Sequence, residues 1–241
     1  MNLLKISLVT LLCFLVIIVL ILVIKNRKIE NIVEKSYLKI EYMRELNNYK
    51  LKVKTTENNM KTNTNREYEQ IYYYKNGKYK IESANSLNFL EDDSYEKICV
   101  YNDLKQIEYY KQNYIEMTKG KLLDIFSEVI NYKKTSSTVY NLSLSVREER
   151  FNGTDCYVIR FGNKNSYRDT WIDKNNYITV KGVNEDIGEF YREDVYTFDE
   201  DATNDDDVNT DILNNNVYKN YTRKHINNNA SEEEKLYYGI K

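Results

Sequence analysis

The pattern of apolar and polar residues in the first part of the chain predicts one long helix. Residues 6–24, ISLVTLLCFLVIIVLILVI, contain no charged residue. A helix rises about 1.5 Å per residue, so this run would extend over about 28 Å, close to the apolar thickness of a bilayer. Over residues 30–46 apolar residues recur at helical spacing, which indicates that the helix continues and packs one face on the residues that follow. We therefore expect an N-terminal transmembrane helix that is joined directly to the rest of the protein.

The end of the apolar run distinguishes an anchor from a cleaved signal peptide. It is followed by Lys25-Asn26-Arg27-Lys28, whereas a signal peptide has a shorter apolar run and then small residues at its cleavage site. This predicts an uncleaved membrane anchor over residues 1–28. Leu12 precedes Cys13, where a bacterial lipobox requires a small residue, so lipidation of Cys13 is not favoured.

After the helix, apolar and charged residues alternate as they do in half-buried strands. Tyr49, Leu51 and Val53 alternate with lysines, and this period of two is typical of a strand with one buried face. Farther along, Asn76-Gly77 lies at the centre of IYYYKNGKYKIES, and Asn-Gly is the strongest short signal for a hairpin. A two-residue turn there pairs Tyr74 with Tyr79 and Tyr72 with Ile81, which places these four side chains on one face. Tyr73 and Lys80 then share the other face.

Strand patterns continue to about residue 199, with one interruption. The apolar residues of 119–134 recur at helical spacing and predict a central helix. After it Tyr140, Leu142, Leu144 and Val146 alternate with polar residues, and Asn152-Gly153 predicts a second tight hairpin. The sequence thus predicts an α+β fold with about ten antiparallel strands, since strands and helices do not alternate as they do around a parallel sheet. From about Asp199 the chain becomes acidic and rich in Asn, so we expect a β-rich domain over 29–213 and a loose tail over 214–241.

Composition and charge exclude several classes of function. The net charge is −2 and the pI about 5.7, without the basic surface that a nucleic acid requires. The chain has one His, His225, and three Cys at positions 13, 99 and 156, none in C-x-x-C spacing, so neither a metal site nor a bound cofactor is predicted. Cys99 and Cys156 lie in predicted strands, where buried free thiols are favoured and a disulfide between them stays open.

The strongest candidate for catalysis is the sequence YRDTWIDKNNYITVKG, where Asp169 and Asp173 flank the single Trp, Trp171. On one strand the three residues share a face, but the two carboxylates are then about 13 Å apart along it. Pairs of carboxylates that cleave sugars lie about 5 to 9.5 Å apart. The alternative is a hairpin with its turn at Asn175-Asn176, which requires no chemistry. We therefore predict that the chain is not an enzyme and has no catalytic residues.

The order of these elements resembles the lipoprotein-carrier family, which is LolA-like and shares its fold with the sigma-factor regulator domains MucB and RseB. The residues that carry the likeness are NGTDCYVIRF, TWIDKNNYITVKG and VYTFD, in that order, after the YYYKNGKYKIES hairpin and the LLDIFSEVI helix. The likeness covers about residues 29–213. It implies an antiparallel, unclosed β-barrel capped by helices, with an apolar cavity for acyl chains. A clostridial protein of the germination-lipoprotein type is the relative that the composition suggests, and such a relative acts by binding a cell-wall amidase.

The resemblance also implies a function. We expect a membrane-anchored, extracytoplasmic protein that binds a lipid, a lipoprotein acyl group or another hydrophobic ligand. The alternative is a non-catalytic interaction module of the envelope or spore, which would bind a cell-wall enzyme or a regulator. The positive-inside rule conflicts with this single-pass orientation, because more positive charges follow the apolar run than precede it. The candidate apolar face of the sheet consists of Tyr72, Tyr74, Tyr79, Ile81, Leu142 and Leu144, although helices could equally cover that face as an ordinary core.

Overall fold

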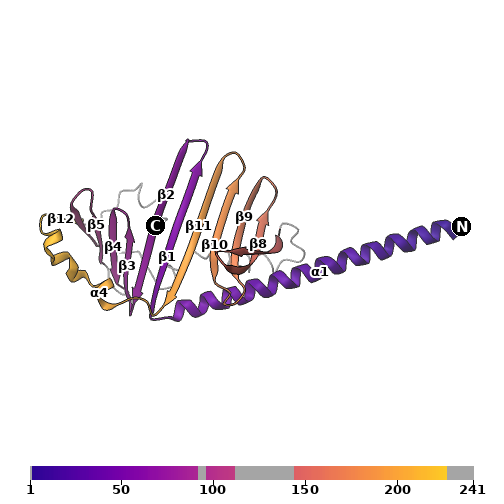
Figure 1. Cartoon of the computed structure of the whole chain (residues 1–241), viewed down its shortest axis with the longest axis horizontal. Helices are drawn as coiled ribbons and strands as arrows, with labels where there is room; N and C mark the ends of the chain where they lie inside the picture. Colours follow the sequence, from indigo (N-terminus) through magenta and orange to yellow (C-terminus); the bar gives the residue numbers. More distant parts are fainter. Residues whose placement is uncertain (1, 92–95, 112–143, 227–241) are drawn as a thin grey trace. The chain divides into compact units, whose positions relative to one another are not determined.

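The computed structural model describes residues 2–91, 96–111 and 144–226. Within them twelve strands form an unclosed sheet in the order β12-β6-β5-β4-β3-β2-β1-β11-β10-β9-β8-β7 (Figure 1). The longer strands are β1 (Asn48–Asn59), β2 (Thr64–Lys75), β7 (Leu144–Phe151), β8 (Thr154–Gly162), β9 (Ser166–Asp173), β10 (Thr179–Asp186) and β11 (Phe190–Glu200). The shorter ones are β3 (Lys78–Ser83), β4 (Ser86–Glu91), β5 (Glu96–Tyr101), β6 (Gln106–Lys111) and β12 (Thr222–Ile226).

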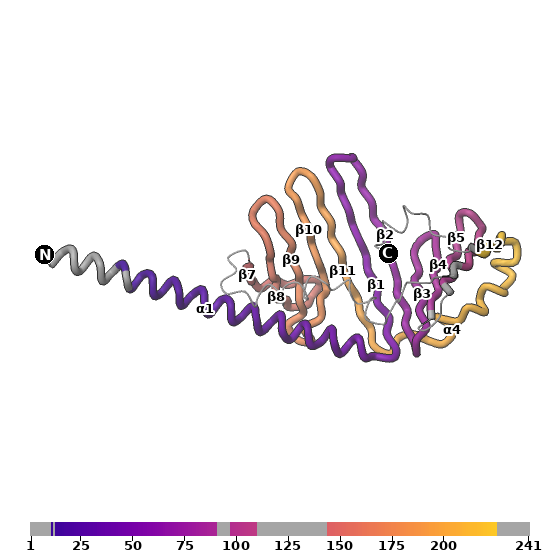
Figure 2. The backbone as a smooth tube through the Cα atoms, turned by 180° about the vertical axis from the view of Figure 1, so that it is seen from behind, coloured from indigo at the N-terminus to yellow at the C-terminus, as the bar shows by residue number. Residues whose placement is uncertain are grey.

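A single helix, α1 (Asn2–Glu45), precedes the strands, as the sequence predicted. The two parts of α1 differ in their surroundings. Its C-terminal half runs beside β7–β10, whereas the described part before it extends beyond these strands (Figure 2). Large apolar side chains are exposed at Leu11, over residues 14–21 and at Ile24, while a stripe on the C-terminal half is buried: Ile29, Ile32, Val33, Ser36 and Ile40. In the part of the chain that the structure describes, no helix is sufficiently long and apolar to cross a membrane.

The chain divides into two compact units, and the first combines most of α1 with β7–β10 and the tip of the β1–β2 hairpin. A polar clamp joins the helix to the strands. The Glu148 carboxylate accepts hydrogen bonds from Lys28 at 2.7 Å and from Lys174 at 2.6 Å, and both ammonium groups lie over the ring of Tyr157. Hydrogen bonds from Lys174 and Lys28 lower the pKa of the Glu148 carboxyl to about 2. Glu148 is therefore ionised whenever the clamp is formed near neutral pH.

Tight turns set the register of the first unit. Asn152 and Gly153 have φ angles of 48° and 86°, the left-handed values that a type I′ turn requires, and they join β7 to β8 as predicted. The turn between β9 and β10 follows Asp173, whose side chain accepts a hydrogen bond from the Asn175 amide at 2.8 Å. The predicted hairpin around Asn175-Asn176 is thus confirmed, and β10 pairs with β9 in antiparallel register.

The second unit contains β2–β6, most of β1, the C-terminal part of β11 and the segment after it. Its tight turn has Asn76 at φ 48° and Gly77 at φ 84°, so the predicted type I′ hairpin is confirmed. One core cluster lies on β4–β6 and the C-terminal segment, and consists of Phe89, Val100, Ile107, Leu213 and Tyr218. Leu213 belongs to η2 (Thr210–Asn214) and Tyr218 to η3 (Asn216–Tyr218), two short turns of 3-10 helix that follow α4 (Asp205–Val208). These two turns cover one face of β4–β6. The polar sequence after Asp199 did not suggest that this segment would pack on the sheet.

The strand count and directions differ from the prediction of about ten antiparallel strands. The described residues form twelve strands, and β12 pairs with β6 in parallel. Four strands, β3 to β6, have only six residues each, and such short strands are difficult to separate from their turns by periodicity. The described part of the predicted tail contains η3 and β12. The predicted central helix over 119–134 lies outside the described residues.

Candidate functional site

The structure places the predicted apolar face at the Tyr74–Tyr79 hairpin. Tyr72 pairs with Ile81 and Tyr74 with Tyr79, as the sequence predicted. Tyr74 and Tyr79 are only 3% and 1% exposed, with ring centroids 4.6 Å apart, and Tyr49 stacks on Tyr74 at 5.1 Å. The centre of this face is therefore aromatic core, and only Tyr72 and Ile81 at its border are half-buried. Of the other predicted residues, Leu144 is buried in β7 of the first unit, and Leu142 lies outside the described residues.

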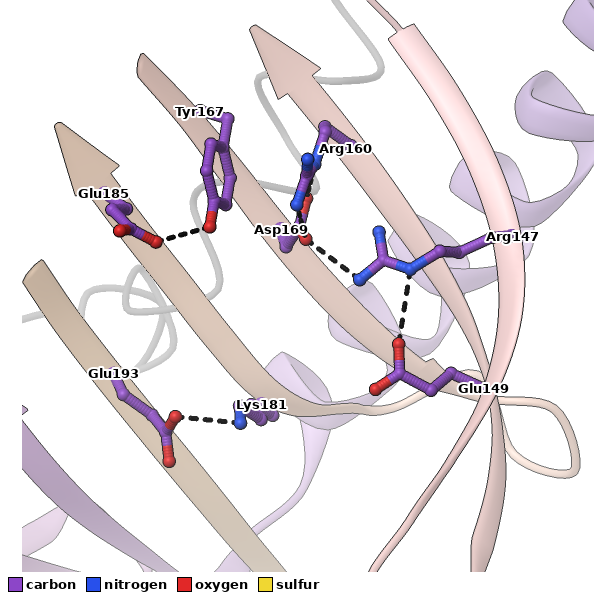
Figure 3. Close-up of polar contacts among 8 residues, drawn as sticks. All are labelled: Arg147, Glu149, Arg160, Tyr167, Asp169, Lys181, Glu185 and Glu193. Atoms are coloured by element: carbon purple, nitrogen blue, oxygen red, sulfur yellow. Dashed lines mark hydrogen bonds and ion pairs between the residues drawn. The ribbon is translucent and has the colours of Figure 1, made fainter. Parts of the chain in front are cut away.

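The carboxylate of Asp169, the first candidate for catalysis, is neutralised by two arginines. Asp169 is 2% exposed, and Arg160 on the paired strand binds it through two hydrogen bonds of 2.7 Å. Arg147 on β7 donates a third bond of 3.0 Å (Figure 3). The bond with Asp169 is the main reason that the pKa of Arg160 is raised. Such bidentate, charge-assisted bonds hold both oxygens of a carboxylate in one geometry, so Asp169 has a structural role in joining β7, β8 and β9.

Asp173, the second candidate, shapes the turn after β9. Its side chain accepts from the Asn175 amide, and its backbone carbonyl accepts from the amide of Tyr177 at 2.9 Å. Tyr177 has a φ of 61°, a left-handed value that turns accommodate. Both aspartates therefore have structural roles, and nothing in the described residues shows catalysis.

The aspartate network belongs to a larger surface, the charged–aromatic face, which spans β7 to β11 of the first unit (Figure 3). Register places these side chains of β7 to β10 on one side of the strands: Arg147, Glu149, Phe151, Arg160, Tyr167, Asp169, Trp171, Lys181 and Glu185. From β11, Glu193 joins them through its ion pair with Lys181, and Tyr191 through its hydrogen bond to Glu193. Cations on this face contact rings: Arg160 stacks on Tyr167, with the guanidinium carbon 3.8 Å from the ring centroid. Trp171 is 6% exposed and packs with Cys156, Val158 and Val183. The face thus combines a small apolar centre with paired charges around it.

Two tyrosine–glutamate pairs complete the face. Tyr167 donates to Glu185, and Tyr191 donates to Glu193 at 2.6 Å. Burial, together with the bond to Glu193, raises the pKa of Tyr191. Burial opposes ionisation of Glu193, but hydrogen bonds from Lys181 and Tyr191 outweigh it and lower the pKa of that carboxyl. Glu193 is thus a fixed, ionised acceptor, and the sequence signal that could have found it is the alternation of charged and aromatic residues over 190–196.

The two cysteines in strands are free thiols. Cys99 and Cys156 are buried and unpaired by disulfides, so the favoured of the two sequence-based alternatives is confirmed. Among the described residues, no group of three or more His, Cys, Asp or Glu side chains could hold a metal ion.

The burial of these thiols leads to a testable prediction. Burial raises the pKa of both the Cys99 and the Cys156 thiol, and only the thiolate reacts with alkylating reagents. Iodoacetamide at pH 8 should therefore modify neither residue in the native protein and both in denaturant, as read by mass spectrometry of the peptides. If the intact mass of the native, unreduced protein is lower than that of the free-thiol form by two hydrogen atoms, the two cysteines form a disulfide instead.

No family model matches this sequence, and neither does the sequence of any curated protein. Solved structures with a similar fold exist. A LolA superfamily protein from Nitrosomonas europaea is 10% identical, with a TM-score of 0.31, and the alignment covers 76% of this chain and 98% of that one. LprF from Mycobacterium bovis is 10% identical with a TM-score of 0.43, over 75% of this chain and 96% of that one.

A third similar structure is the MucA/MucB complex from Pseudomonas aeruginosa, at 9% identity and a TM-score of 0.36, over 76% of this chain and 61% of the other. Two of these similar structures, the LolA superfamily protein and MucB, carry the names of families that the order of elements in the sequence also resembles. The relationship to a germination lipoprotein stays a prediction.

Proposed function

We propose that this chain is a non-catalytic binding protein that is tethered to a membrane and takes a hydrophobic ligand, such as the acyl group of a lipid or lipoprotein, outside the cytoplasm. The observation that carries the proposal is the contrast between the two halves of α1. One half is fixed to strands by a buried stripe and a polar clamp, and the other exposes apolar side chains.

The exposed part of α1 is apolar around its whole circumference. Every residue from Phe14 to Ile21 is exposed, and Phe14 reaches 70%. This run covers more than two helical turns, so no single protein surface could cover all of it. A helix that is apolar all round is stable when lipid or other apolar groups surround it. Embedding in a bilayer would satisfy this requirement, with Lys25 and Arg27 at the edge of the apolar zone.

The ligand part of the proposal has two supports. The half-buried Tyr72 and Ile81 border the aromatic core of the β2–β3 hairpin and offer apolar surface of the kind that contacts an acyl chain. The order of elements along the sequence resembles a family with an acyl-chain cavity. The absence of catalysis is proposed because the two candidate carboxylates, Asp169 and Asp173, already have structural partners.

Charged substitutions in α1 test the tether. Ile17 and Leu20 are 53% and 54% exposed, and each Asp near the centre of a membrane-embedded helix costs about 2.5 to 3.5 kcal/mol. The Ile17→Asp/Leu20→Asp variant should therefore shift from the membrane fraction, after a carbonate wash, to the soluble fraction. The matched control is Leu38→Asp/Tyr42→Asp, at exposed positions of the docked half, which should stay with the membrane.

The same preparations test the rest of the proposal. Organic extraction and mass spectrometry of the purified full chain should recover a bound acyl-containing molecule, and protease added to intact cells should digest the body. A wild-type chain that is washed off the membrane, or a body protected from protease, would contradict the proposed function.

A further inference from the structure

The side chain of Lys181 lies in a cage of two aromatic rings and one carboxylate. Its ammonium nitrogen is 4.9 Å from the ring centroid of Trp171 and 5.0 Å from that of Phe151. Glu193 closes the cage with an oxygen 2.8 Å from the same nitrogen (Figure 3). Both ring distances are within the range of about 6 Å over which a cation is attracted to an aromatic face. The arrangement is thus complementary to an alkylammonium group.

The walls of this cage are held in place without Lys181. Trp171 and Phe151 belong to one apolar cluster with Cys156, Val158 and Val183. The Tyr191 hydroxyl donates to the Glu193 carboxylate at 2.6 Å. Cage walls that keep their positions are a requirement for binding a ligand with little loss of entropy.

A backbone irregularity aims Lys181 into the cage. The pairing of β10 with β9 shifts between Thr179 and Lys181, so that Thr179 faces Ile172 and Lys181 faces Trp171, with Val180 between them. Such a bulge redirects side chains and is over-represented beside functional sites. Lys181 is 16% exposed along its side chain, so its flexible stem has a path to solvent.

Lys181 is a poor choice if the position serves packing alone. A largely buried lysine loses its hydration, and a carboxylate partner recovers this cost only in part, so an apolar residue of similar volume is often as stable or more so. A lysine does provide a group that fills the cage and can leave it, because a lysine side chain is long and flexible.

We propose that Trp171, Phe151 and Glu193 form a binding site for an alkylammonium group, which Lys181 fills in this structure and vacates when a ligand enters. The ligand class is a primary or quaternary alkylammonium compound, either free or as the head group of a lipid. The rings attract its charge and exclude water, and Glu193 neutralises it. This site stands on the contacts of the first unit alone and does not depend on the proposed tether or on an acyl ligand.

The single Trp of the chain reports directly on this site. Choline and ethylammonium are titrated into the full chain in a maltoside detergent, while the emission of Trp171 is recorded. The Lys181→Ala variant, whose cage is vacant, should bind both compounds at least tenfold more tightly than the wild type. A tenfold change is the size expected for a cation–aromatic contact with ionic pairing. Adding Glu193→Gln to the Lys181→Ala variant should weaken its binding of both compounds tenfold or more.

Two controls separate the site from general effects of charge and stability. Lys164→Ala removes an exposed lysine in the turn between β8 and β9 and should bind choline as the wild type does. If Lys181→Ala does not fold alone, recovery of its folded state by ethylammonium supports the site, and no recovery overturns it. The proposal is also overturned if Lys181→Ala folds but its Trp171 emission does not change at millimolar ligand, in 100-fold excess over the protein.

The source of the ammonium group is resolved by a second titration of the wild type. Dihexanoyl phosphatidylcholine is compared with choline and with dihexanoyl phosphatidylglycerol, which lacks the ammonium group. Tighter binding of the phosphatidylcholine than of choline identifies a lipid head group, and equal binding identifies a free alkylammonium compound. Equal binding of the two lipids would contradict the proposal.

Discussion

Replacing Asp169 with Asn should lower the free energy of unfolding by about 3 kcal/mol, because removing one partner from a buried ionic network leaves the others uncompensated. Asp169 is 2% exposed and receives three hydrogen bonds from two guanidinium groups. An amide in its place keeps the volume but loses the charge, and its NH2 group would face guanidinium donors. Arg147 and Arg160 are 42% and 35% exposed, so water recovers part of the loss. Denaturant unfolding of the full chain, followed by Trp171 fluorescence and circular dichroism, measures the change.

The control for this variant lies one hairpin away. Asp155 on β8 is 70% exposed, and its contact with Arg150 is 4.0 Å long. Exposed pairs of this kind contribute about 0 to 1 kcal/mol, so Asp155→Asn should unfold close to the wild type. A loss below 1 kcal/mol for Asp169→Asn would mean that the two arginines do not depend on this carboxylate, and Asp169 would again become a candidate for function.

Replacing Tyr79 with Ala should lower the free energy of unfolding by about 3 to 5 kcal/mol, the usual cost of removing a large aromatic side chain from a core. Tyr79 is 1% exposed, and its ring lies 4.6 Å from that of Tyr74. The Tyr79→Ala substitution removes both the buried apolar area of the ring and its contact with the Tyr74 ring. The neighbouring side chains cannot replace these without moving. Unfolding in denaturant, with circular dichroism as the probe, gives the value.

Tyr72→Ala is the matched control, since Tyr72 lies on the same face of the same hairpin and is only half-buried. It should cost about 1 kcal/mol or less, as partial burial implies. If instead the two variants are equally stable and Tyr79→Ala releases a bound hydrophobic molecule, the predicted apolar face would be a ligand surface at its centre and not a core.

Short sequence signals predicted the turns and the strand pairings next to them, because these features depend on residues that are neighbours in the sequence. Asn76-Gly77 and Asn152-Gly153 gave the positions of two hairpins, because these residues readily adopt positive φ. Once the turn is placed, the period of two determines which residues meet, and the pairing of Tyr74 with Tyr79 follows. The prediction that Asp169 and Asp173 lie on one strand that leads into a turn is confirmed for the same reason.

Features that depend on pairing between distant strands could not be predicted. Arg147 is 22 positions from Asp169, and one register error on either strand would have moved it to the opposite face. The cage around Lys181 requires side chains from β7, β9, β10 and β11 together with a bulge that has no sequence signature. The parallel pairing of β12 with β6 was missed because TRKHI lacks the alternation of a half-buried strand.

The clamp of Lys28, Glu148 and Lys174 has a mechanical consequence. One carboxylate holds both the helix and the turn after β9, and Lys35 adds a second contact at Tyr177, 3.1 Å from its hydroxyl. Lys28 and Lys35 are about two turns apart on α1, so the helix cannot spin about its own axis without breaking both. A pull or a twist applied to the N-terminal end of α1 would therefore be transmitted as torque to β7 and to the turn that carries Tyr177. The helix and these strands would rotate together.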